Sequence, residues 1–390
     1  MTRLPTRLIV TVAVLEFVSG TPYGLVNDFV PVWMREQGAS LEAVGALSAL
    51  AMPWHLKAFW GPLVDRYLGF RAWIIGALLG IGSVTLAGPW LGDKLVPALL
   101  AVAVLGGLQD VALDGWVVGA VPVGQEGRAT GVRIAAYRAA LALGGGGAVF
   151  VGGRWGWDFG WYVVASLLVV GAVGILSLDR PPAAQPSALA DWIRDFGRWL
   201  SRPGNAMVLF LALVFKLGDA AMAPMTRPFW LDSGLTAEQV GLLNTIAGSI
   251  VTAIGAVIGG EVTSRIGVLR AGLVLGVLAL SSNLVYAGVA VLPEPGIVVG
   301  AGVFESFTSG LGTAPMMAIL MRACGHEQTA TRFAILSSVA GLTRTVAGSL
   351  SGVGAAELGY AGYFALTAAL AVPGLLLLPL VTRRLPSDAS

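Results

Sequence analysis

The chain alternates long apolar runs with short polar or Gly/Pro-rich breaks along its whole length. Each run is long enough to cross a bilayer as a helix, which takes about 20 residues. The pattern predicts twelve transmembrane helices, over residues 7–34, 41–60, 72–91, 95–121, 129–153, 160–178, 205–231, 236–259, 269–292, 296–321, 329–353 and 360–382. Arg3 and Arg7 precede the first run without a small-residue cleavage site after it, so we interpret this run as a retained span and not a signal peptide.

The composition agrees with a polytopic membrane protein surrounded by the lipid bilayer. Of the 390 residues, 56% are hydrophobic and only 12% are charged, whereas soluble domains contain about 25% charged residues. The mean hydropathy is +0.80. The formal net charge of +2 is too small to indicate a nucleic-acid partner. We therefore expect an all-α multi-pass protein with no nucleic-acid partner, and we also expect a monomer.

The scarcity of cysteine and histidine excludes several kinds of site. The single cysteine, Cys324, excludes an intrachain disulfide and a cysteine metal cluster, and His55 and His326 are too few for a multi-histidine site. We expect no metal and no cofactor. The alternative class is a membrane-embedded acyltransferase or hydrolase, which needs a nucleophile with a base or a metal. The sequence offers no such constellation around His55, and Cys324 and His326 share one loop without a third group, so we do not expect an enzyme.

The longest polar interruption separates the sixth and seventh predicted spans. It predicts two six-helix bundles, over residues 1–178 and 205–390, joined by a linker over 179–204. Within the linker, Leu189–Leu200 places apolar residues on one helical face and charged residues on the other. This pattern predicts a short amphipathic helix that lies along the membrane surface.

The distribution of basic residues predicts the orientation. Most arginines fall on the side of the two termini and the linker, whereas Arg35, Lys94 and Arg154 fall on the other side. The positive-inside rule therefore places both termini in the cytoplasm. We expect a multi-pass protein of the cytoplasmic (inner) membrane.

Two loops at matching places in the two halves share a spacing. After the second span, Gly61, Asp65 and Gly69 follow one another at intervals of four residues. After the eighth span, residues 259–267 repeat a Gly, a polar residue and a Gly at the same intervals, with basic residues nearby. A loop repeated in two six-helix halves indicates a duplicated transporter.

The loop that contains Gly61, Asp65, Arg66, Gly69 and Arg71 resembles the signature loop of the major facilitator superfamily. Segments in both halves are similar to the AmpG-type muropeptide permeases and the related acetyl-CoA transporters, over residues 17–22, 56–66, 109–116, 136–138, 216–219, 240–244, 305–314 and 329–338. The resemblance implies the major facilitator fold and a gating role for the loop. It also implies a muropeptide-like substrate, with acetyl-CoA or another anionic metabolite as the alternative.

Charged residues inside the predicted spans require an explanation, because inserting a charged side chain at the bilayer centre costs about 2.5–3.5 kcal/mol of free energy. They have both signs and occur in both halves, which is typical of a polar cavity between two bundles. The set is Glu16, Asp28, Lys57, Asp110, Asp114, Arg133, Arg138, Lys216, Asp219, Arg227, Glu305 and Arg344.

Asp110 and Asp114 lie one helical turn apart and share a face. Two carboxylates in a poorly hydrated place make one of them a candidate proton carrier. The alternative is a structural pair that binds Arg133 or Arg138 on the neighbouring span. Arg133 and Tyr137 are also one turn apart and would present a guanidinium and a phenol to an anionic, sugar-bearing substrate.

Four further residues are candidates for substrate binding. Lys216 and Asp219 are three residues apart, so they either neutralise each other or contact the substrate. Gln109 and Asn244 lie in segments that are similar to the permeases, and the resemblance implies that they also contact the substrate.

Glu16, Asp28 and Glu305 are additional candidates for proton coupling, and Glu305 either binds a proton or pairs with Arg344. The chain contains no Walker-type phosphate-binding loop, so a gradient and not ATP would drive it. We therefore predict a secondary transporter that moves a small polar, partly anionic solute by alternating access. Protons are the predicted coupling ion, in symport with the solute.

Overall fold

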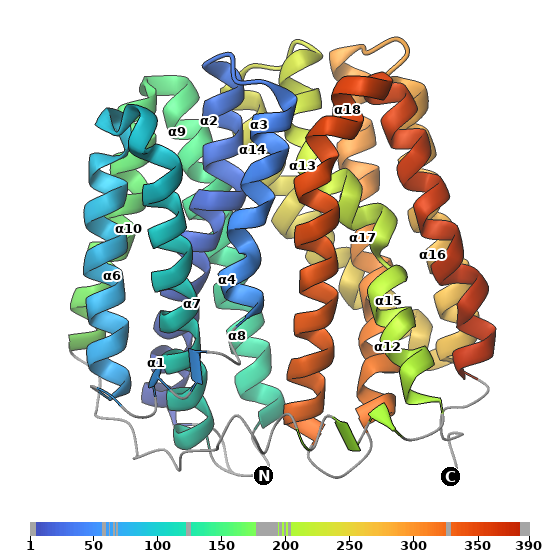
Figure 1. Cartoon of the computed structure of the whole chain (residues 1–390), viewed down its shortest axis with the longest axis horizontal. Helices are drawn as coiled ribbons and strands as arrows, with labels where there is room; N and C mark the ends of the chain where they lie inside the picture. Colours follow the sequence, from blue (N-terminus) through green and yellow to red (C-terminus); the bar gives the residue numbers. More distant parts are fainter. Residues whose placement is uncertain are drawn as a thin grey trace. The chain divides into compact units, whose positions relative to one another are not determined.

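The computed structural model describes residues 5–56, 60–61, 63–64, 67, 69–121, 126–176, 194, 197–198, 200–201, 204–324 and 329–382. Within these ranges every regular element is a helix (Figure 1), which confirms the predicted all-α class. Asp65 and Arg66 of the predicted gating loop, His326 and most of the predicted linker helix lie outside the described residues.

Ten helices among the described residues are long and apolar enough to span a membrane. The last of them, Gly341–Val381, contains the non-helical Gly359, where the last two predicted spans meet. The predicted second span, 41–60, is not one of the ten because it is divided into α3 (Leu41–Ala46), a short 3-10 segment and α4 (Met52–His55). The count of twelve spans therefore stays a prediction.

The chain forms two compact units. The first contains α1 (Thr6–Gly24), α2 (Val30–Glu36), α4, α6 (Phe70–Ala87), α7 (Leu95–Ala120), α8 (Glu126–Leu141), α9 (Ala148–Trp155), α10 (Trp157–Leu176) and α14 (Ala237–Thr245). The second contains α3, α12 (Asn205–Val214), α13 (Leu217–Asp232), α15 (Thr252–Ile266), α16 (Val268–Val289), α17 (Pro295–Cys324) and α18 (Thr329–Thr382).

Each unit is built from helices that pack along their lengths. In the first unit α1 packs against α7, α8 and α10, and α6 packs against α7 and α10 (Figure 1). In the second unit α17 packs against α15 and α16, while α18 packs against α13 and α16. Buried aliphatic and aromatic residues such as Leu211, Phe215, Ile319 and Leu378 form a core at one end of the second unit.

Each unit also includes one short helix from the other half of the sequence. α3 belongs to the second unit and packs against α18, and α14 belongs to the first unit and packs against α9. Glycine permits both close approaches. A Cβ atom on Gly45 would lie 2.5 Å from the Gly352 nitrogen, and one on Gly153 would lie 2.9 Å from the Ala237 carbonyl carbon. The predicted boundary at 179–204 falls mostly outside the described residues and stays a prediction.

The predicted internal repeat has a counterpart in the backbone. Gly69 precedes α6 with φ of 76°, and Gly267 precedes α16 with φ of 82°. Positive φ values of this size favour glycine, because other residues would place a Cβ atom against the backbone. The two glycines that end the matching loops therefore make the same turn into a helix, which supports a duplicated architecture.

Several spans are interrupted in their middle. π-helical segments occur at Leu25–Phe29, Ala142–Gly147 and Ile246–Val251, and such segments are frequent at functional sites. The four-glycine run within Ala142–Gly147 allows close packing, since a Cβ atom on Gly145 would lie 2.6 Å from Asp28 Oδ2. The predicted seventh span, 205–231, is broken between α12 and α13, where Lys216 adopts a non-helical conformation.

Candidate functional site

Arg133 lies at the centre of a charge cluster in the first unit. Its guanidinium, on α8, forms ion pairs with Glu16 on α1 and with Asp114 on α7. The Glu16 side chain is only 7% exposed, whereas those of Arg133 and Asp114 are about one-third exposed, at 29% and 32%. A planar guanidinium suits this arrangement because its N–H groups point to two carboxylates at once. The cluster therefore joins three helices around one buried and one accessible acid.

The residues beside this cluster are also hydrogen-bonded. Ser19 Oγ donates to Asp110 Oδ1 at 2.8 Å, so Asp110 lies one turn from the cluster with a partner on α1. Gln109 is fully buried, and its amide donates to the Val18 carbonyl oxygen at 3.0 Å. A fully buried side chain with a backbone partner on α1 can fix the packing of α7 against α1.

Three aromatic rings lie close together in the same unit. The Tyr23 ring meets the Trp54 ring edge-on with 5.5 Å between centroids, and it lies 6.3 Å from the Tyr137 ring. Tyr137 is one helical turn from Arg133 on α8. Tyr23 and Tyr137 are both half-buried. The first unit thus combines partly accessible aromatic faces with the charge cluster.

The second unit has a charge cluster of its own at the break between α12 and α13. Lys216 Nζ lies 3.3 Å from Asp219 Oδ2, so these residues form an ion pair. The ammonium also donates to the Ser309 carbonyl oxygen at 2.9 Å and to Thr313 Oγ1 at 3.2 Å, both on α17. Its three donors therefore have three acceptors.

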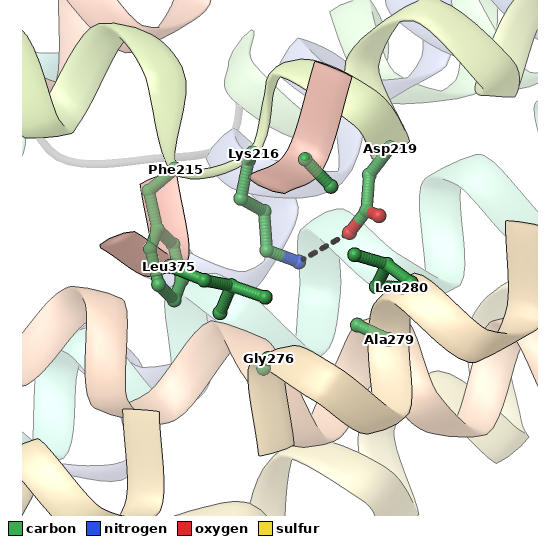
Figure 2. A pocket seen from close by; sticks show the side chains of 9 residues that line it. Phe215, Lys216, Asp219, Gly276, Ala279, Leu280 and Leu375 are labelled. Carbon is green, nitrogen blue, oxygen red and sulfur yellow. Dashed lines mark ion pairs between the residues drawn. The ribbon is translucent and has the colours of Figure 1, made fainter. Parts of the chain in front are cut away.

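The Lys216–Asp219 pair lines a small pocket inside the second unit. The other walls come from α16, α17 and α18 and are apolar, with Gly276, Ala279 and Leu375 among the lining residues. Figure 2 shows the Lys216 side chain extending from the helix break towards the Asp219 carboxylate. An ion pair in such surroundings persists because each charge is matched by polar partners.

Glu305, one turn before Ser309 on α17, has a much weaker set of contacts. Its carboxylate accepts one hydrogen bond, from Ser306 Oγ at 3.3 Å. The predicted alternative, an ion pair between Glu305 and Arg344, stays a prediction. The two residues lie on different helices, and sequence spacing could not show which faces meet.

The remaining predicted residues occupy other positions along the chain. Asp28 is buried in the π-helical segment beside Gly145, and Asn244 is buried near the end of α14. Gly61 lies before the start of α6, and the Arg71 side chain donates to the Leu176 carbonyl oxygen. The roles assigned to these residues stay predictions.

Sequence reasoning missed several members of the site. The pairing of Glu16 with Arg133 depends on how α1 packs against α8, which helical spacing does not reveal. Ser309 and Thr313 could have been found, because they are polar residues one turn apart on the apolar span that also carries Glu305.

Comparisons with known proteins identify the family to which this chain belongs. The family model of the Major Facilitator Superfamily matches residues 12–217 and again residues 208–390. The anhydromuropeptide permease of Escherichia coli (strain K12) is 29% identical over 384 residues, which cover 94% of this chain and 78% of the permease. An uncharacterised protein of Haemophilus influenzae is 29% identical over 405 residues, which cover 96% and 94%. These matches confirm the predicted resemblance.

Solved structures agree on the fold. The nucleoside transporter NupG has a TM-score of 0.76 at 13% identity, covering 96% of this chain and 99% of NupG. A D-xylose–proton symporter has a TM-score of 0.72 at 12% identity, covering 97% of each chain. At such low identity these neighbours show a shared fold and leave the substrate open.

Proposed function

Because the chain belongs to the Major Facilitator Superfamily, we propose that it is a secondary transporter that moves a muropeptide-like solute together with protons across the cytoplasmic membrane. The observation that carries the proposal is the Glu16–Arg133–Asp114 cluster beside half-buried tyrosines, in a chain that is 29% identical to the E. coli permease over 94% of its length. A muropeptide joins sugar rings to a peptide that carries both charges.

The aromatic residues supply a surface for the sugar. The apolar faces of sugar rings pack against aromatic rings, and tyrosine adds a hydroxyl that hydrogen-bonds their substituents. Tyr23 and Tyr137 are half-buried, and Trp54 supports Tyr23 from the edge. This arrangement favours a ring-bearing solute over a small inorganic anion.

The charge cluster supplies partners for the peptide part. Arg133 can donate hydrogen bonds to the carboxylate of a zwitterion, and the partly exposed Asp114 can accept them from its ammonium group. A solute carboxylate would take one of the places that Glu16 and Asp114 hold on the guanidinium.

Alternating access requires helix contacts that can separate and re-form. We propose that the α3–α18 and α14–α9 crossings do this, because each joins a short helix to a partner from the other half of the sequence. Glycine at both crossings provides a close contact without interlocked side chains. The gating loop with Asp65 and Arg66 would then control the switch, as the family resemblance implies.

A binding panel on the purified protein in nanodiscs tests the substrate class. The probes are an anhydro-disaccharide tripeptide, the disaccharide alone, the tripeptide alone and acetyl-CoA. We expect the conjugate to bind most tightly and both fragments to bind more weakly. Tightest binding of acetyl-CoA would favour the anionic-metabolite alternative, and conversion of a probe to a new product would favour the enzyme class.

A matched pair of variants locates the sugar contact. Tyr137→Ala should weaken binding of the disaccharide by roughly two- to tenfold, the equivalent of about 0.5–1.4 kcal/mol. Tyr162→Ala removes a tyrosine of the same unit that instead packs against Trp90 and Phe159, and it should leave binding unchanged. Equal affinities of the two variants would contradict the proposed sugar site.

A further inference from the structure

We propose that Glu305 on α17 is the residue that binds and releases the coupling proton, and that the Lys216–Asp219 pair is the counter-charge that governs its release. This inference rests on the proposed proton-coupled transport and adds the site. It selects Glu305 from the predicted candidates for proton coupling, which also include Asp110, Asp114, Glu16 and Asp28.

The embedded acids of the two units differ in their partners. Glu16 and Asp114 share the Arg133 guanidinium, and arginine stays protonated in proteins. Both acids therefore have a permanent counter-charge. Glu305 has a single hydrogen bond, from Ser306 Oγ at 3.3 Å, and no ion pair among the described residues.

The surroundings of Glu305 favour the protonated carboxyl group. A carboxylate in an apolar span that forms no ion pair is unfavourable, and a bound proton removes its charge. Glu305 is partly buried. A group of this kind takes up a proton when it is enclosed and releases it when water or a cation approaches.

The charged groups around Glu305 come mainly from the broken α12–α13 span. Lys216, Asp219 and Arg227 act on it electrostatically from the broken α12–α13 span, and Tyr286 interacts with it from α16. α15, α18 and the π segment Ile246–Val251 also pack on α17, but in the described part of the chain they present no charged group that acts on Glu305. Lys216 and Asp219 are thus its principal charged neighbours.

Lys216 is placed to change partners. Its ammonium binds the Ser309 carbonyl oxygen, and Ser309 lies one turn from Glu305 on the same face of α17. The flexible lysine stem allows the ammonium to turn from Asp219 towards Glu305. When Glu305 releases its proton to water, its O–H bond breaks, the carboxylate keeps the electron pair, and Lys216 stays protonated as the shared counter-charge.

Infrared titration of the purified protein in nanodiscs tests this without a substrate. We expect the wild type to show a protonated-carboxyl band that disappears as the pH rises, and we expect Glu305→Gln to lack it. Glu294→Gln, which removes an exposed acid just before α17, should keep the band. The same band in Glu305→Gln as in the wild type would overturn the proposal.

A second variant tests the counter-charge. Lys216→Met removes the cation, so the midpoint of the Glu305 band should move to higher pH by roughly one unit, a tenfold tighter hold on the proton. Lys216→Arg should restore most of the wild-type midpoint. An unchanged midpoint in Lys216→Met would contradict the role of the Lys216–Asp219 pair.

Transport assays separate this inference from the proposed function. With the anhydro-disaccharide tripeptide, Glu305→Gln should keep solute exchange without a gradient but lose about tenfold in proton-driven accumulation. Wild-type accumulation by the variant would overturn the proton site. If the wild type itself ignores the gradient, the proposed coupling fails, and the infrared titration still decides whether Glu305 binds a proton.

Discussion

Gly45→Ala should weaken the crossing of α3 with α18 and shift the protein towards conformations in which these helices are apart. The new Cβ atom would lie 2.5 Å from the Gly352 nitrogen and 2.9 Å from its Cα atom. Both are backbone atoms, so no side chain can rotate away to make room. Relief requires that one helix moves away from the other.

The expected size of the effect follows from the cost of overpacking. An extra methyl group in a tight contact costs about 1–3 kcal/mol. If two conformations differ in this contact, that cost changes their ratio by roughly 5- to 150-fold. A change of this size is measurable as a population even when the wild type strongly favours one conformation.

Spin-label distance measurements test this prediction directly. Labels on Glu42→Cys and Glu357→Cys, two exposed positions on α3 and α18, would be introduced in a Cys324→Ser background. Gly45→Ala should transfer population from short to long distances. Gly300→Ala on α17 is the control, because nothing lies within 4 Å of the added methyl group. An unchanged distance distribution in Gly45→Ala would refute the reasoning.

Three further predictions address the charges and the orientation. Arg133→Ala leaves Glu16 and Asp114 without their shared cation and should lower the free energy of unfolding by about 3–5 kcal/mol. Denaturation in detergent measures this loss, and Arg133→Lys should recover part of it. Asp65→Asn should slow transport while the equilibrium affinity for the solute stays within about twofold; a large loss of affinity in a folded variant would contradict a gating role. A cysteine at Arg194 in the cysteine-free background should react with impermeant reagents only from the cytoplasmic side, and labelling from outside would reverse the predicted orientation.

The fold was largely predictable because membrane spans are easy to identify in a sequence. Long apolar runs identify helices, since every backbone polar group in a bilayer must be satisfied within the chain. The breaks were not predictable. Residues 47–51 and Lys216 depart from the α-helix inside runs that read as continuous, because packing and not composition decides where a span bends.

The candidate site was predictable only in part. Helical spacing identified the Lys216–Asp219 pair, and neighbouring spans suggested that Arg133 would bind an acid such as Asp114. Spacing could not indicate that Glu16 shares the same guanidinium, nor that Lys216 binds Ser309 and Thr313 on α17. Those contacts depend on which faces of distant helices meet.

The placement of α3 and α14 had no signal in the sequence. Each lies in a predicted span of one half, yet α3 packs against α18 and α14 packs against α9. Gly45 and Gly153 show why these contacts form, since only a missing side chain lets the backbones approach so closely. A glycine in an apolar run predicts a close contact but not its partner.

Proton movement during solute uptake tests the central claim most directly. Wild-type protein would be reconstituted in vesicles that contain a pH-sensitive dye, with the membrane potential held at zero, and the anhydro-disaccharide tripeptide would be added outside. The account predicts that the vesicle interior acidifies in step with uptake of labelled solute, and that an imposed inward proton gradient drives accumulation above the external concentration. Uptake without any change in internal pH, or no uptake of this solute under any gradient, would contradict it.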